Sequence, residues 1–194
     1  MAELAFYFDY RSPYAYLAQT QVRQLGASIS WRPFEVLQLM NKVGNVPTSF
    51  TCKPKNRYIG VDLARWAGLY KVQLRPHPEG GKIDARRLLR ATLAAAELGQ
   101  ADAAVAALFS AYWEKGAPLS TAADVAAVLS EAGVDGADLA DRIDAPDLDA
   151  ALDAATDEAV SRGVFGAPTL FVGDEMFFGN DRLEFVRASL GAAA

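Results

Sequence analysis

A serine and a proline stand near the start of the chain, where an apolar segment gives way to a helical pattern. The apolar run LAFYFD is followed by Tyr10, Arg11, Ser12 and Pro13. The Ser12 hydroxyl can cap a helix, and Pro13 suits the first helical turn, where a missing N–H costs nothing. The junction contains no cysteine, so it cannot exchange disulfides. Taken alone, this stretch is explained most simply as a plain helix cap.

Few other residues suggest chemistry by themselves. The chain has one cysteine and one histidine, so it has neither a disulfide framework nor a Cys/His metal cluster, and we expect no metal. Cys52 has no histidine motif nearby, so we interpret it as a packed or incidental thiol. His77 lies between two prolines and is interpreted as a loop residue. The segment EGGKI lacks the flanking residues of a nucleotide-binding P-loop.

Charge is distributed unevenly along the chain. The net charge is −5, which argues against general binding to nucleic acid or to an anionic membrane. Residues 42–90 hold 11 Lys and Arg against 3 Asp and Glu, a local charge of 11 − 3 = +8. This segment is either a basic surface that balances acidic neighbours or an anion-binding region.

The elements that must position Ser12 follow from hydrophobic patterns. The opening run, LAFYFD, is typical of a strand buried on both faces. A helix is predicted from Pro13 to about Leu25, and residues 28–36 alternate as a second strand. A strand, a helix and a strand in this order indicate a right-handed βαβ unit.

The middle of the chain has a different residue pattern, which is mainly helical. Residues 48–60 are polar and irregular and are predicted to form a loop, whereas residues 61–162 read as a series of helices separated by glycines and prolines. Thr121 and Asp124 form a weak capping box at the start of one of these helices. The intervening apolar residues keep helical spacing, so we expect packed helices.

The end of the chain returns to strands. PTLFV and EMFFG are joined by Gly173-Asp174, which suits a type II′ hairpin turn, and a closing helix is predicted with Asn180 or Asp181 near its N-cap. The predicted fold is α/β: a thioredoxin-like fold with a large helical insertion between its βαβ and ββα halves. The boundaries are residues 1–36 and 163–194 for the discontinuous thioredoxin-like domain and 37–162 for the insertion.

Two motifs carry a resemblance to a known family. FYFDYRSPYAYLA at the start and VFGAPTLFVGDEMFFGNDRLEFV at the end are similar to motifs of the 2-hydroxychromene-2-carboxylate isomerases. These isomerases belong with the kappa-class glutathione transferases in the superfamily of bacterial disulfide oxidoreductases. Weaker similarity lies in LQLMNKVGNVP and KPKNRYIGVDLARWAGLY.

The resemblance implies a glutathione site at the predicted strand–helix junction. A glutathione thiolate would occupy the helix N-terminus that holds a cysteine thiolate in disulfide enzymes, and the Ser12 hydroxyl would donate to its sulfur. Ala167 would precede a cis proline and pair with the cysteinyl part of glutathione. The γ-glutamyl end would meet Gly179, Asn180 and Asp181. Without the resemblance, a trans proline and a simple cap at Asn180 or Asp181 remain open alternatives.

The resemblance also implies an aromatic carboxylate as substrate. Lys42, Asn56 and Arg57 align with family positions near the substrate, and cationic and amide donors suit a carboxylate. A solvated surface charge is an equally good interpretation of Lys42 and of Arg57 taken singly. Residues 76–84 depart from the family pattern and leave the far wall of the pocket undefined.

The expected function is therefore a glutathione-dependent isomerase of aromatic-hydrocarbon catabolism. It would interconvert 2-hydroxychromene-2-carboxylate and trans-o-hydroxybenzylidenepyruvate, with Ser12 as the catalytic residue and glutathione as the cofactor. The alternatives are a kappa-like glutathione transferase or peroxidase, and a cysteine-free thioredoxin-like binding module. The first residues do not form a signal peptide and no segment suits a membrane span, so we expect a cytoplasmic protein. The resemblance further implies a homodimer.

Overall fold

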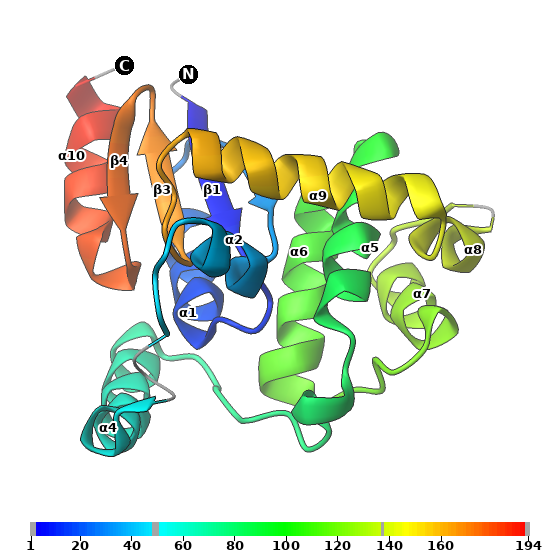
Figure 1. Ribbon diagram of the computed structural model, residues 1–194, viewed down its shortest axis with the longest axis horizontal. Helices are drawn as coiled ribbons and strands as arrows, with labels where there is room; N and C mark the ends of the chain where they lie inside the picture. Colours follow the sequence, from blue (N-terminus) through cyan, green and yellow to red (C-terminus); the bar gives the residue numbers. More distant parts are fainter. Residues whose placement is uncertain (1–2, 48–50, 137, 193–194) are drawn as a thin grey trace.

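The chain folds around a four-stranded mixed sheet with helices on both faces (Figure 1). The computed structural model describes residues 3–47, 51–136 and 138–192. The strand order is β2-β1-β3-β4, in which β1 and β2 are parallel and the other neighbours are antiparallel. The strands are β1 (Glu3–Phe8), β2 (Ser28–Pro33), β3 (Thr169–Val172) and β4 (Glu175–Phe178). This is the predicted thioredoxin-like plan, and the βαβ and ββα halves meet where β1 pairs with β3.

The helices belong to three parts of the chain. The first half supplies α1 (Pro13–Val22) and α2 (Val36–Lys42), and the second half supplies a 3₁₀ turn, η3 (Asn180–Arg182), and α10 (Leu183–Ala192). Between the halves lie α4 (Lys53–Tyr70), η1 (Gly80–Lys82), α5 (Ala85–Glu97), α6 (Ala101–Ser110), η2 (Ala111–Lys115, a π-helix), α7 (Ala122–Glu131), α8 (Leu139–Ile143) and α9 (Pro146–Ser161). Among the described residues, no helix is both long and apolar enough to cross a bilayer.

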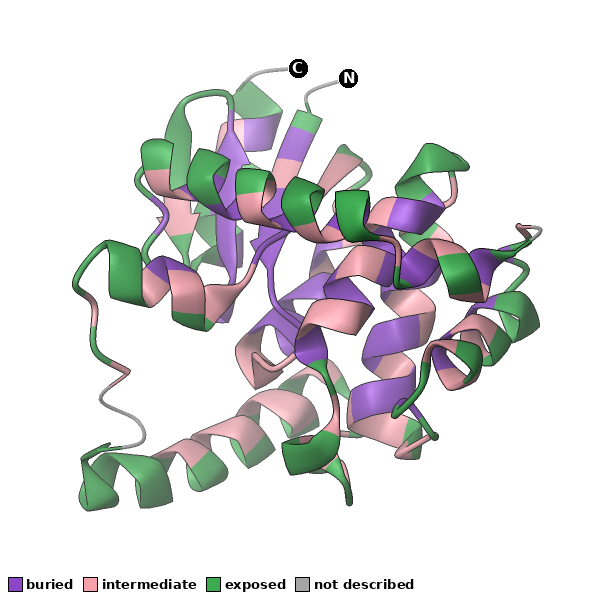
Figure 2. Ribbon diagram, turned by 45° about the vertical axis from the view of Figure 1, so that its right-hand side comes forward, coloured by how far each residue is buried: buried purple, intermediate pink, exposed green. Residues whose placement is uncertain are grey.

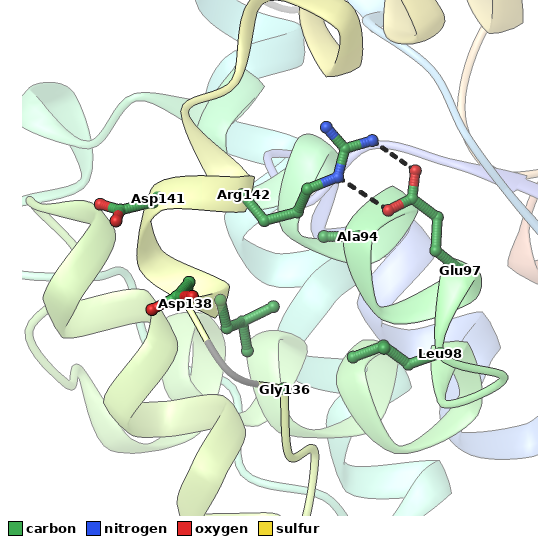
Figure 3. A pocket seen from close by; sticks show the side chains of 8 residues that line it. Ala94, Glu97, Leu98, Gly136, Asp138, Asp141 and Arg142 are labelled. Atoms are coloured by element: carbon green, nitrogen blue, oxygen red, sulfur yellow. Dashed lines mark hydrogen bonds and ion pairs between the residues drawn. The ribbon is translucent and has the colours of Figure 1, made fainter.

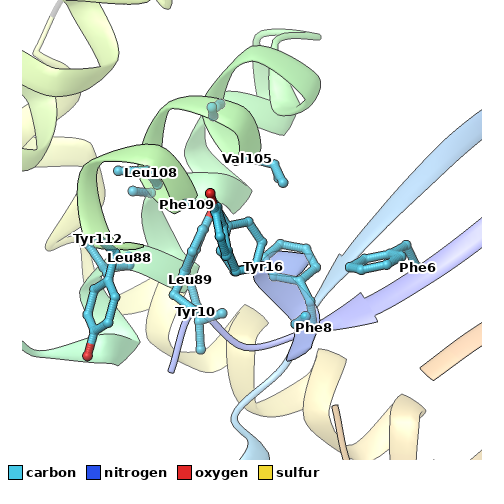
Figure 4. Close-up of a cluster of buried hydrophobic side chains, with 14 of the residues drawn as sticks. Phe6, Phe8, Tyr10, Tyr16, Leu88, Leu89, Val105, Leu108, Phe109 and Tyr112 are labelled. Carbon is cyan, nitrogen blue, oxygen red and sulfur yellow. The ribbon is translucent and has the colours of Figure 1, made fainter. Parts of the chain in front are cut away.

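Alternation along β1 explains how the sheet is buried on both faces. Tyr7 packs with Phe34, Leu39 and Ala159 under α2 and α9, whereas Phe6 and Phe8 point to the face covered by α1. Phe8 continues into a buried aromatic cluster with Tyr10, Tyr16 and Phe109 (Figure 4). Phe109 belongs to α6, so this hydrophobic core runs without a break from the sheet into the helical insertion (Figure 2). The predicted domain boundaries remain predictions, since a continuous core neither marks nor excludes them.

Local predictions mostly hold in the structure. Thr121 and Asp124 form the predicted capping box at the start of α7. Gly173 has a φ of +59°, the left-handed value that the first position of a type II′ turn requires. The predicted closing helix starts later than expected, because Asn180–Arg182 form a 3₁₀ turn and α10 begins at Leu183.

The predicted loop over residues 48–60 is wrong from Lys53 onward. Residues 48–50 lie outside the described part, and α4 begins at Lys53, with Pro54 in its first turn. Alpha-helical spacing does exist at Ile59, Leu63 and Trp66, but the first six residues of the helix are exposed, and four of them are Lys, Asn or Arg. The helix has no fully buried residue, so its amphipathic signal is weak at the N-terminal end.

Candidate functional site

Ser12 closes a tight turn between β1 and α1. Its N–H donates to the carbonyl oxygen of Asp9 at 3.0 Å, and its own extended backbone places it as the N-cap of α1. The Ser12 hydroxyl oxygen accepts a hydrogen bond from the N–H of Ala15 at 3.1 Å. The cap predicted from the sequence is therefore present.

The same hydroxyl reaches the opposite half of the fold. Ser12 Oγ donates to the carbonyl oxygen of Ala167 at 3.0 Å, and the Ala167–Pro168 peptide bond is cis, as predicted. The N–H of Gly179 donates to the carbonyl of Pro168 at 3.0 Å. These bonds place the serine, the cis-proline loop and the end of β4 in one neighbourhood.

Gly179 is required by the carboxylate beside it. Its φ is +98°, and a Cβ built there would lie 2.6 Å from Asp181 Oδ1. Asp181 is exposed and pairs with Arg182 at 2.5 Å. A side chain at this position would be strained by the positive φ and would displace the Asp181 carboxylate, so both features favour glycine. The expected approach of the γ-glutamyl end of glutathione to Gly179 remains a prediction.

Asn180 is buried, with 4 % of its surface exposed. Its side-chain Nδ2 has no hydrogen-bond partner among the described residues, although buried amide groups are nearly always paired. An unpaired amide donor beside the cis-proline loop and Asp181 suits a polar ligand that brings an acceptor to this end of the site.

Helix α4 borders the site through two tyrosines that the sequence analysis did not single out. The Tyr14 hydroxyl, two residues after Ser12, donates to Asp62 Oδ2 of α4 at 2.8 Å. The Tyr70 hydroxyl of α4 donates to the carbonyl of Asn180 at 3.0 Å. Burial, followed by the hydrogen bond to Asp62, raises the pKa of Tyr14, so its hydroxyl stays protonated and acts as a donor. One feature of the sequence could have pointed to Tyr14 as a site residue, namely its position in the first helical turn after Ser12. No feature of the sequence indicated that Asp62 or Tyr70 would lie at the site.

Electrostatics at the start of α1 favours a bound anion. The first turn contains no acidic residue, and Pro13 contributes no N–H. The N–H of Tyr14 has no acceptor within the helix, because the first N–H groups of any helix lack an intrahelical partner. A negatively charged sulfur at this helix end would be stabilised by that N–H and by the helix dipole.

The three predicted substrate residues lie on two helices. Lys42, at the end of α2, forms an ion pair with Asp157 of α9. Asn56 and Arg57 are exposed in the first turns of α4. The Arg57 side chain forms no hydrogen bond or ion pair with the described residues, whereas Asn56 has a partner. The roles of all three toward a substrate remain predictions.

Residues 76–84, for which the sequence left the far wall of the pocket undefined, form a loop with the short 3₁₀ helix η1, and the loop packs on the π-helix. His77 Nδ1 accepts from the N–H of Glu79 at 3.0 Å, and Nε2 contacts the carbonyl of Ala117 at 2.9 Å. The His77 ring lies 5.4 Å from that of Tyr112, centroid to centroid. The structure thus supports the loop role of His77, since both ring nitrogens are occupied by backbone groups.

Two other candidate regions carry no evident chemistry. A hollow of about 470 Å³ lies between α5 and α8, but Ser12 is not among its lining residues. Figure 3 shows these residues, among which Arg142 pairs with Glu97. Cys52 is a free, exposed thiol before α4. In the described part of the chain, no group of three His, Cys, Asp or Glu could hold a metal ion.

Comparison with known proteins gives the class of this fold. Residues 3–191 match the family of DSBA-like thioredoxin domains, and the chain belongs to this family. A probable DsbA oxidoreductase from Streptomyces coelicolor shares the fold, with a TM-score of 0.75 at 16% identity over 100% of this chain and 90% of that one.

Within this family the chain belongs to the 2-hydroxychromene-2-carboxylate isomerases. The enzyme of that name from Pseudomonas sp. (strain C18) is 33% identical over 97% of this chain and 90% of its own. The one from Sphingobium xenophagum is 33% identical over 95% of this chain and 96% of its own. A solved structure of a 2-hydroxychromene-2-carboxylate isomerase has a TM-score of 0.88 at 32% identity, covering 98% of this chain and 95% of that one. The relatives are isomerases, and the resemblance seen in the two end motifs is confirmed.

Proposed function

We propose that this protein is a glutathione-dependent isomerase that interconverts 2-hydroxychromene-2-carboxylate and trans-o-hydroxybenzylidenepyruvate in aromatic-hydrocarbon catabolism. The observation that carries the proposal is the Ser12 hydroxyl, which caps α1 and contacts the carbonyl before the cis proline in a site without cysteine. The names of the relatives support the substrate.

The residues at the site fit a glutathione molecule. Ala167 O is an acceptor in the segment just before β3 begins at Thr169, where an extended peptide could pair with backbone groups. The unpaired Asn180 amide and the exposed Asp181 carboxylate suit the carboxylate and amine of a γ-glutamyl end. When bound, glutathione would supply a thiolate nucleophile that adds to the conjugated substrate, permits rotation about the former double bond, and leaves unchanged.

Ser12 has one hydroxyl proton and two uses for it. In the structure, the Ser12 hydroxyl donates this proton to the Ala167 carbonyl. When a peptide N–H takes over that carbonyl, the hydroxyl is released to donate toward an anion at the helix end, while its oxygen still accepts from Ala15. Ser12 and the Tyr14 N–H then hold negative charge in place, which is the role of preorganised donors in catalysis.

The substrate would be held from the α2 and α4 sides. Arg57 is available for a carboxylate, and Lys42 would have to exchange Asp157 for the substrate. Asn56 would add an amide donor. Cationic groups at these positions would stabilise the enolate that develops as the thiolate adds. The homodimer remains a prediction from resemblance.

The proposal is tested by removing glutathione from the purified enzyme and following chromene absorbance. Activity should be absent, should return with reduced glutathione, and should not return with S-methylglutathione, which keeps the peptide but has no free thiol. S-methylglutathione should also inhibit competitively with glutathione. Full turnover without any thiol would contradict the proposal. Glutathione binding without turnover of the chromene acid would instead favour the kappa-like transferase or peroxidase, and no binding would favour a binding module.

A further inference from the structure

A buried carboxylate lies directly behind the turn that carries Ser12. The side chain of Asp9 is fully buried, yet it accepts hydrogen bonds at both oxygens. Oδ1 accepts from the backbone N–H of Arg11 at 2.9 Å and from its Nε at 3.1 Å. Oδ2 accepts from Arg11 Nη2 at 2.6 Å and from the N–H of Val36, at the start of α2, at 3.0 Å.

These contacts fix the turn from inside. The carbonyl of Asp9 accepts from the N–H of Ser12, and its carboxylate accepts from the N–H of Arg11, so one residue orients two successive peptide units before the helix. A buried carboxylate survives only when it is paired and hydrogen-bonded, and Arg11 provides both. The position of the Ser12 hydroxyl therefore depends on a side chain that does not touch the site.

The ion pairs continue into the helical insertion. Arg11 also contacts Glu35 Oε1 at 3.2 Å, and Glu35 Oε2 is 3.3 Å from Arg86 Nη1 of α5. Arg86 pairs in turn with Asp149 at 2.8 Å and Asp153 at 3.0 Å, both on α9. We name Asp9, Arg11, Glu35 and Arg86 the turn-anchoring chain.

A second attachment reaches the same turn from the π-helix. Trp113 Nε1 donates to the carbonyl of Tyr10 at 2.8 Å, and the Tyr10 hydroxyl shares a 2.6 Å hydrogen bond with Thr92 of α5. Tyr10 and Arg11, the two central residues of the turn, are thus both connected to the insertion, which supplies rigid supports.

We propose that Asp9 is a positioning residue for Ser12, and that the turn-anchoring chain lets the helical insertion control the geometry of the catalytic hydroxyl. The proposal rests on the function proposed above. The Asp9 side chain is fully buried and presents no surface to a ligand, so in this proposal it acts only through the turn from residue 9 to residue 12.

Asp9→Asn tests this by replacing one acceptor oxygen with an amide that faces donors. We expect the kcat of isomerisation to fall about tenfold or more, because a buried charge-assisted contact is lost, while KM for the substrate changes little. The fraction of bound glutathione present as thiolate, measured by its ultraviolet absorbance, should also fall. Glu35→Gln, which leaves Asp9 intact, should shift both quantities in the same direction by less.

A double-mutant cycle separates positioning from general damage. If Asp9 acts through Ser12, adding Asp9→Asn to Ser12→Ala should lower kcat by less than about twofold further. Glu97→Gln serves as the matched control, because it breaks the Arg142 ion pair elsewhere in the insertion and should leave kcat unchanged.

Several results would overturn the proposal. A folded Asp9→Asn variant with wild-type kcat and thiolate fraction would do so, as would full additivity with Ser12→Ala. If Asp9→Asn fails to fold, Glu35→Gln tests the proposal in its place. A wild-type kcat in Glu35→Gln would show that the turn-anchoring chain does not control the Ser12 hydroxyl. If the wild-type enzyme neither binds nor needs glutathione, the proposed function fails instead, and that result is visible before any variant is made.

Discussion

Ser12 Oγ donates a hydrogen bond to the carbonyl oxygen of Ala167 at 3.0 Å, which joins two residues 155 positions apart in the sequence. One belongs to the βαβ half and the other directly precedes the cis proline of the ββα half. The helical insertion lies between them in the chain but leaves this contact intact. The relationship makes Ser12 both a cap for α1 and a member of a site assembled from both ends of the chain.

Ser12→Ala should lower turnover much more than it lowers stability. Losing the cap costs about 1 kcal/mol of the free energy of unfolding, whereas losing a donor to a thiolate costs on the order of 1.5–3 kcal/mol, or roughly tenfold to a hundredfold in rate. Chemical denaturation and initial-rate assays measure the two effects. Thr121→Ala, which removes the cap of α7, is the matched control and should cost similar stability without loss of activity. Equal activity in the two variants would make Ser12 a structural cap.

Gly179→Ala should weaken glutathione binding. The new Cβ would lie 2.6 Å from Asp181 Oδ1, so the carboxylate must move, and the φ of +98° with a ψ of 161°, a conformation that only glycine adopts readily, adds backbone strain of about 1–3 kcal/mol. Gly173→Ala is the control, since that glycine also has positive φ, but a Cβ added to it would meet no atom within 4 Å. Calorimetric titration should show weaker binding only in Gly179→Ala. Unchanged affinity there would remove Asp181 from the glutathione site.

Lys42→Ala and Asp157→Asn distinguish a substrate contact from a surface ion pair. Both substitutions break the pair between α2 and α9. If Lys42 binds the substrate carboxylate, only Lys42→Ala should raise the KM, because it removes a contact that contributes on the order of 1.5–3 kcal/mol to substrate binding. Arg57→Ala should behave in the same way. If both substitutions lower stability slightly and leave the KM unchanged, Lys42 has no role in the site.

Acid should destabilise the fold through the carboxylates that pair with α5. Hydrogen bonds from Arg87 lower the pKa of Asp144, and those from Arg86 lower the pKa of Asp149, below their ordinary value of 3.8. Because these folded-state pKa values are depressed, the stabilisation is present above the unfolded-state value and is lost as the pH falls through the folded-state value. Both side chains are more than a third exposed, so solvent screening keeps each contribution small.

Urea unfolding at a series of pH values checks this prediction. The midpoint should decline below about pH 4. Arg86→Gln should lower the midpoint near neutral pH and partly flatten the decline, because Asp149 then loses the largest cause of its lowered pKa and keeps only its pairing with Arg90. A variant with the same pH slope as the wild type would show that Arg86 contributes nothing to acid stability.

Much of the fold could be predicted because its signals are local. The apolar opening strand, the Ser12-Pro13 helix start and the Gly173 hairpin each follow from neighbouring residues. The cis state of Pro168 came from the family resemblance, since base rates for proline favour trans. The start of α4 was not predicted, because its first residues are exposed and mostly polar. The side of α4 that faces the fold is defined by tertiary contacts such as Tyr14–Asp62, which local composition does not indicate.

The supports of the site could not be predicted, because they join residues that are distant in sequence. Asp9 gives no signal that it will bind Val36, and Glu35 gives none that it will lie between Arg11 and Arg86. The basic segment from residue 42 to residue 90 shows the same limit. Its charge alone left open a basic surface that balances acidic neighbours and an anion-binding region, and Arg86, Arg87 and Arg90 pair with acidic residues of the insertion, as the first interpretation expects.

The most direct test of the proposed function follows glutathione and the chromene acid together in one reaction. An isomerase that returns its thiol should complete many turnovers for each glutathione present, with the concentration of free thiol unchanged at the end. Ser12→Ala should slow this reaction without changing its stoichiometry. Loss of one thiol for each chromene consumed, with little trans-o-hydroxybenzylidenepyruvate formed, would contradict the isomerase and identify a transferase.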